Sequence, residues 1–114
     1  MKDDTIYLLH IRDAIDRIFT YTTDGESAFK NDLKTQDAVI RNFEIIGEAT
    51  KKLSDTLKTK HPDIPWRKIT GMRDRLIHDY FGVSLNIVWD TIINFLPELK
   101  KKIEGLLKNN KTNI

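Results

Sequence analysis

The chain has 114 residues, of which 39% are hydrophobic and 32% charged, as in a single soluble domain that buries its own core. Nineteen lysines and arginines oppose seventeen acids, and the net charge of +2 excludes a uniformly basic nucleic-acid-binding coat. The sequence has no cysteine and no apolar run near the roughly 18 residues of a membrane span, which excludes disulfides, cysteine nucleophiles and membrane helices and predicts a cytoplasmic protein.

Two helices are predicted in the first half of the chain. Over residues 4–22, apolar residues recur every three or four positions, which is the spacing of one buried helix stripe. A short helical turn is expected around residues 27–30. A longer helix is predicted from Gln36, with Thr35 as its N-cap, and Ser54 is a second candidate cap at which this helix would break in two. Its expected buried seam consists of Val39, Phe43, Ile46, Leu53 and Leu57.

Two further helices are predicted after the segment KHPDIPW. A proline at the first helical position loses no hydrogen bond, so the third helix starts at Pro65 or Trp66 and runs to about Tyr80. Ser84 is a suitable N-cap for a fourth helix, and Pro97 is expected to bend that helix because it removes one internal hydrogen bond.

The predicted fold is all-α. No strand pattern and no internal repeat appear in the sequence. The four main helices and the short helical segments are expected to form one antiparallel bundle joined by short loops. This domain is expected to cover residues 1–108, and residues 109–114 are expected to be a disordered tail because they offer nothing to bury.

The sequence predicts neither a metal site nor a cofactor. His10, His61 and His78 are scattered along the chain, and none of them is at helical spacing from another histidine. The sequence also lacks an aspartate-rich calcium loop and a glycine-rich phosphate loop. We therefore expect chemistry that uses side chains alone.

The third predicted helix holds most of the chemistry-bearing residues, in the segment GMRDRLIHDYFG. Asp74 and His78 lie one turn apart on the same face, where a carboxylate favours the protonated imidazole and fixes its orientation. Arg73 and His78 are about 140° apart around the helix, so they are not natural neighbours within it. Either the long arginine wraps round, or the helix loosens, or a second copy of the chain supplies the missing half in a symmetric dimer.

Several residues also have an interpretation without chemistry. A histidine on a charged helix face is commonly a solvated surface residue. Trp66 and Trp89 are expected in the core or in a dimer interface, and Gly47 and Glu48 in helix or subunit packing. Two groups of lysines are interpreted as solvated helix faces, namely Lys100, Lys101 and Lys102, and Lys51, Lys52, Lys58 and Lys60.

The run Arg73-x4-His78-x-Tyr80 resembles the RX4HXY signature of HEPN-domain ribonuclease toxins of the HepT kind. The resemblance extends over nearly the whole chain, through the blocks Asp37–Ser54, His61–Phe81, Val88–Ile92 and Leu96–Leu99. It implies an HEPN-type helical bundle that forms a homodimer. It also implies a metal-independent endoribonuclease that cleaves RNA without a cofactor.

The resemblance further implies roles for four residues. His78 would be the general acid or base, Arg73 would hold the scissile phosphate, and Asp74 would orient His78. Tyr80 would be adenylylated by a minimal nucleotidyltransferase antitoxin of the MntA kind, in a bacterial or archaeal toxin–antitoxin system. The position of Asp74 is usually polar in this family, often asparagine, and an acid so near the phosphate is expected to lower activity.

Two alternatives to the nuclease remain open at this point. The chain could be a non-catalytic HEPN module that binds nucleotides or protein partners. It could also be an inert subunit that scaffolds a nucleotidyltransferase. Both alternatives predict the same fold but no cleavage of RNA.

Overall fold

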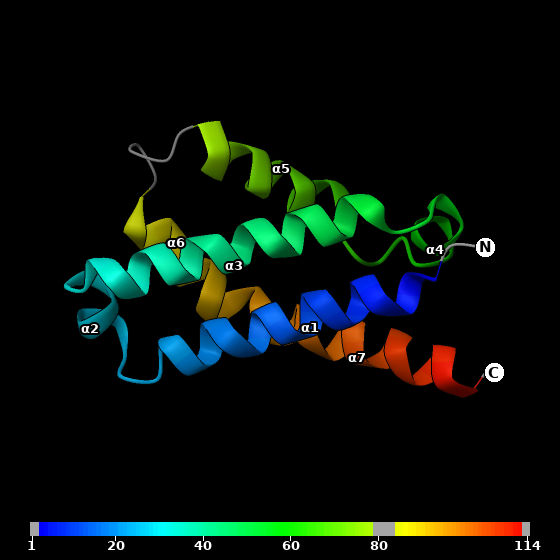
Figure 1. Cartoon of the computed structure of the whole chain (residues 1–114), viewed down its shortest axis with the longest axis horizontal. Coiled ribbons are helices and arrows are strands. Elements are labelled where there is room, and N and C mark those ends of the chain that lie inside the picture. Colours follow the sequence, from blue (N-terminus) through cyan, green and yellow to red (C-terminus); the bar gives the residue numbers. More distant parts are fainter. Residues whose placement is uncertain (1–2, 79–83, 113–114) are drawn as a thin grey trace.

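The computed structural model describes residues 3–78 and 84–112, and within these ranges every regular element is a helix. The helices are α1 (Asp4–Tyr21), α2 (Glu26–Lys30), α3 (Leu33–Lys52), α4 (Asp55–Lys60), α5 (Trp66–His78), α6 (Leu85–Asn94) and α7 (Leu96–Thr112). Figure 1 shows α3 between α1 and α5, with neighbouring long helices antiparallel and α7 alongside α1. The predicted all-α bundle is confirmed.

One continuous apolar core holds these helices together. The five residues predicted as the seam of the second long helix are all buried. Trp66 packs against the core and its indole Nε1 donates to the carbonyl oxygens of Lys58 and His61 at 3.2 and 3.0 Å. The ring of Trp89 lies 5.6 Å from that of Phe29. Both tryptophans therefore contribute to the core, as predicted.

The start of α3 differs from the prediction. The helix begins at Leu33, and Asp32 rather than Thr35 is its N-cap, with its carboxylate accepting from the Lys34 N–H at 3.2 Å. The Thr35 hydroxyl donates to the same carboxylate at 2.7 Å, so it supports the cap instead of forming it. The expectation of a start at Gln36 was wrong because Leu33 is 68% exposed and adds nothing to the buried apolar stripe.

The long helix breaks in two at Ser54 as predicted, with Leu53 as the C-cap of α3 and Ser54 as the N-cap of α4, and Ser54 also contacts the first turn of α1. Its Oγ accepts from the Leu57 N–H at 3.2 Å and so caps α4. The Asp4 carboxylate accepts from the Ser54 N–H at 2.8 Å and from the Ser54 hydroxyl at 2.6 Å. The first turn of α1 is thereby bound to the junction between α3 and α4.

The fourth predicted helix is two helices. Ser84 caps α6 as expected, with its Oγ accepting from the Ile87 N–H at 3.4 Å. The helix is interrupted at Phe95, between α6 and α7. Pro97 is the second residue of α7, where its missing N–H would have had no intrahelical partner. The expectation of a single bent helix was therefore wrong.

The division of the chain at residue 108 stays a prediction, although α7 itself continues to Thr112. In the described ranges, no helix has both the length and the apolar character that crossing a membrane requires.

Candidate active site

The contact between α3 and α5 places Arg73 directly against Gly47. A Cβ built on Gly47 would overlap the Arg73 Cβ and would lie 2.6 Å from the Arg73 Cγ. Only a residue without a side chain therefore allows α5 to approach α3 this closely. The predicted packing role of Gly47 is confirmed, and its partner is the arginine of the motif.

Two carboxylates accompany the Arg73 guanidinium. Its Nη1 lies 3.0 Å from Asp74 Oδ1, and its Nη2 lies 3.9 Å from Glu48 Oε1. Glu48 in turn lies 3.7 Å from Nη1 of Arg41. The Arg73 side chain is 25% exposed, and its Nε is buried without a hydrogen-bond partner among the described residues. The Cβ and Cγ atoms of Arg73 are thus held against Gly47, and its guanidinium reaches the surface.

Asp74 is held by two cations. Its Oδ1 accepts from Lys51 Nζ at 2.9 Å as well as from Arg73. The hydrogen bond from Lys51, and then that from Arg73, keep the pKa of the Asp74 carboxyl below its ordinary value of 3.8. Asp74 is therefore ionised at neutral pH. Its expected role in orienting His78 stays a prediction, because the imidazole lies outside the described side chains.

The backbone of α5 excludes one of the three explanations for how Arg73 and His78 could act together. The helix is continuous from Trp66 to His78, so the idea that it loosens between the two motif residues was wrong. A wrapped arginine and a second copy of the chain remain the two explanations. Tyr80, the expected site of adenylylation, lies outside the described residues.

Sequence reasoning missed the partners that α3 supplies to this site. Lys51 was interpreted as a solvated residue, yet it pairs with Asp74 across the helix contact. Glu48 was assigned to packing, yet its carboxylate lies between Arg41 and Arg73. A signal was present, because Arg41, Glu48 and Lys51 recur at spacings of seven and three along one face of the helix.

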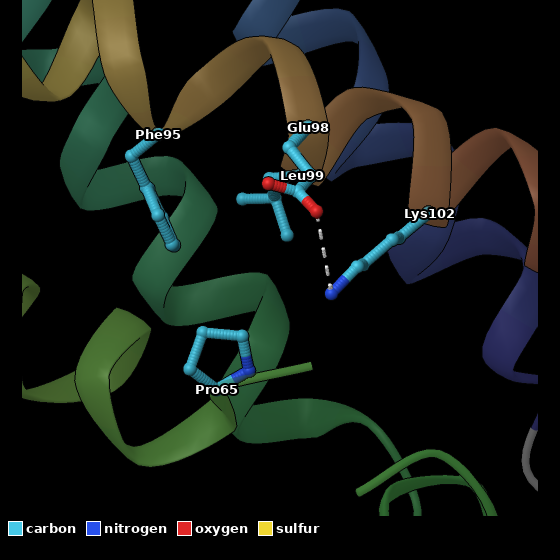
Figure 2. A pocket seen from close by; sticks show the side chains of 5 residues that line it. All are labelled: Pro65, Phe95, Glu98, Leu99 and Lys102. Carbon is cyan, nitrogen blue, oxygen red and sulfur yellow. Dashed lines mark ion pairs between the residues drawn. The ribbon is translucent and has the colours of Figure 1, made fainter. Parts of the chain in front are cut away.

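A pocket lies near the start of α5. It has a volume of about 170 Å³ and lies where the start of α5 meets the junction of α6 and α7 (Figure 2). Lys102 and Glu98 pair across its rim at 4.0 Å. Its lining consists of Pro65, Phe95, Glu98, Leu99 and Lys102. Of the motif residues whose side chains the structure describes, none contributes to this lining.

Comparison with known proteins assigns the chain to a family. The family model described as Ribonuclease HepT-like matches residues 11–106, which include the whole Arg73–Tyr80 motif. The chain belongs to the HepT-like ribonuclease family. The resemblance inferred from the sequence is confirmed.

Archaeal and bacterial relatives support the same assignment. A "probable ribonuclease HepT" of Thermococcus cleftensis is 48% identical over 90% of this chain and 94% of its own length. A candidate RNase of Methanocaldococcus jannaschii is 41% identical over 95% of this chain and 90% of its own. A candidate RNase of Caldanaerobacter subterraneus is 49% identical over 65% of this chain and 66% of its own. Among solved structures, none matches this chain.

Proposed function

We propose that this chain is a metal-independent endoribonuclease and the toxin of a toxin–antitoxin pair. The supporting observation is the placement of Arg73, whose side chain emerges from a glycine contact between α3 and α5 in the same helix as His78. Membership of the HepT-like ribonuclease family supports RNA as the substrate.

The proposed reaction needs only proton transfer and charge stabilisation. The 2′-OH of RNA attacks the adjacent phosphorus, the bond to the 5′-oxygen breaks, and a 2′,3′-cyclic phosphate forms. His78 takes the proton of the 2′-OH or gives a proton to the leaving 5′-oxygen, a contribution of about 10²–10⁴-fold. The Arg73 guanidinium holds the phosphate and its developing charge through paired N–H donors.

Cleavage in excess EDTA tests this proposal. The purified chain should cut single-stranded RNA and leave a 2′,3′-cyclic phosphate or its hydrolysis product. His78→Ala and Arg73→Ala should each lower the rate by roughly 10²-fold or more, with an unchanged circular dichroism spectrum. A folded His78→Ala variant that cuts as fast as the parent would overturn the assignment. Binding of RNA by the parent without cleavage would favour the non-catalytic module.

We also propose a homodimer in which each active site is formed by residues from both chains. In that dimer the Arg73 of one chain and the His78 of the other act on the same phosphate, which removes the unfavourable offset within one helix. Mixing Arg73→Ala with His78→Ala after joint refolding should then restore roughly a quarter of the parental rate, because half of the dimers regain one intact site. A mixture no faster than its components would support the wrapped arginine instead.

The proposed regulator is a minimal nucleotidyltransferase antitoxin that transfers AMP to Tyr80. A phosphodiester anion close to Arg73 would compete with RNA phosphate, and the adenosine would obstruct the substrate. Co-expression with such a partner should yield protein heavier by one or more AMP units, with the modification at Tyr80 by peptide mass spectrometry. Tyr80→Phe should stay folded and active. Neutralised protein that carries an unmodified Tyr80 would contradict this mechanism.

A further inference from the structure

Two helices direct a cation at the same carboxylate oxygen. Lys51 Nζ, from α3, and Arg73 Nη1, from α5, lie 2.9 and 3.0 Å from Oδ1 of Asp74. A single oxygen atom therefore separates the two cationic groups. This arrangement is a cation pair with an anion already bound between its members.

Among the described residues, the ion-pair network that contains this oxygen has more cations than carboxylates. Lys51 and Arg73 pair with Asp74, and Glu48 lies between Arg73 and Arg41, which gives three cations and two carboxylates. The Glu48 contacts are long, at 3.7 and 3.9 Å, so Asp74 is the tightest counter-charge of Lys51 and Arg73. An incoming anion would meet a net attractive group of charges.

The ion pair between Lys51 and Asp74 is also exposed enough for an incoming anion to replace the carboxylate. The side chains of Lys51 and Asp74 are 44% and 47% exposed, and ion pairs at such exposure contribute little to stability because water screens the two charges. A phosphodiester offers two charged oxygens where the carboxylate uses one. Lysine then acts as a point charge, and arginine donates as a fork, which is the combination that suits a phosphate.

We infer that Lys51 and Arg73 together bind a phosphodiester of RNA, and that the Asp74 carboxylate occupies this position until RNA displaces it. This inference rests on the proposed nuclease function. It makes Lys51 a substrate-binding residue and Asp74 an internal competitor of the substrate. The RNA backbone then crosses the line of contact between α3 and α5, because Lys51 belongs to α3 and Arg73 to α5.

A 2′-O-methyl RNA oligonucleotide is the probe, because it keeps the phosphates and lacks the free 2′-OH that cleavage requires. Its Kd is measured over a range of salt concentrations. Lys51→Gln should weaken binding roughly tenfold at ~0.1 M salt and lower the salt slope by about 0.7. Lys51→Arg should retain most of the affinity, because it keeps the charge. Circular dichroism verifies that each variant is folded.

Lys52→Gln is the matched control. It removes the same charge one residue further along the chain, where the Lys52 ammonium lies over the ring of Tyr7 at 5.9 Å and not at Asp74. Its effect on Kd should stay within about twofold, since it alters only the distant field. Equal effects of Lys51→Gln and Lys52→Gln would overturn the inference, as would a parent chain that does not bind the probe. Cleavage of ordinary RNA by the parent tests the proposed function separately.

Asp74 variants test the competitor role. Asp74→Asn and Asp74→Ala should both tighten binding of the probe, by roughly three- to fivefold, because each removes the anion that holds the two cations. The loss caused by Lys51→Gln should be larger in the Asp74→Asn background, where the lysine is released. Weaker binding by both Asp74 variants would show that the carboxylate supports the cations instead of competing, and would overturn this half of the inference.

Discussion

The two sides of α3 differ in what they stabilise. Toward the core, the helix contributes fully buried apolar residues such as Val39, Phe43 and Ile46. Toward α5 it contributes a bare backbone at Gly47 and half-exposed charges at Glu48 and Lys51. The core side stabilises the fold through apolar burial, whereas the α5 side positions an arginine. One helix thus divides apolar packing and the positioning of Arg73 between its two faces.

The largest effect is expected from a change on the core side. Phe43→Ala should lower the free energy of unfolding by about 3–5 kcal/mol, because Phe43 is 1% exposed and leaves a cavity. RNA cleavage per folded molecule should stay close to the parental rate at a temperature well below the transition. Urea unfolding and an activity assay measure the two quantities. Leu33→Ala is the control, since Leu33 is exposed on the same helix and should change stability by less than about 0.5 kcal/mol.

A smaller loss of stability and a larger loss of activity are expected from the α5 side. Gly47→Ala forces α5 away from α3, at a cost of about 1–3 kcal/mol, and moves Arg73 with it. Cleavage should fall about tenfold or more, because a displacement of about 1 Å is costly in a catalytic site.

Gly105→Ala is the matched control for that change. This glycine lies within α7, and an added Cβ meets no atom within 4 Å. The substitution should raise stability by roughly 0.5–1 kcal/mol and leave cleavage unchanged. A Gly47→Ala variant with parental activity would show that Arg73 does not depend on the close contact of the two helices.

The smallest effect concerns acid stability. Asp74 has a pKa below 3.8 in the folded chain, owing to Lys51 and Arg73, so its contribution is present above pH 3.8 and is lost as the pH falls through the lowered value. The parent should therefore lose slightly more stability than Asp74→Asn as the pH is lowered below 3.8. Thermal unfolding of both proteins at several acidic pH values measures the difference. Parallel pH profiles would mean that the ion pairs do not persist in solution.

Much of the fold could be predicted from the sequence because apolar spacing records which face of a helix is buried. The seam of α3, the caps at Ser54 and Ser84 and the position of both tryptophans all follow from such local patterns. The break at Phe95 was missed because Leu96 and Leu99 continue the apolar pattern across it.

The site could be predicted only in part. Arg73, Asp74 and His78 were predicted as site residues because they are close together in one helix and because the motif resembles that of HepT-type ribonucleases. The link between Lys51 and Asp74 was missed because it joins residues 23 positions apart, and only the packing of α3 on α5 brings them together. The reason for Gly47 was missed in the same way, since a glycine within a helix does not reveal which side chain it accommodates.

The contact between Asp4 and Ser54 has a consequence for the order in which a newly made chain can fold. The two residues are 50 positions apart, so Asp4 leaves the ribosome well before Ser54 does. At synthesis rates of about 5–20 residues per second, the first turn of α1 waits roughly 3 to 10 seconds for the hydrogen bonds that fix it. Because α1 packs chiefly on α3, which is also made later, α1 becomes stable only after α3 has emerged.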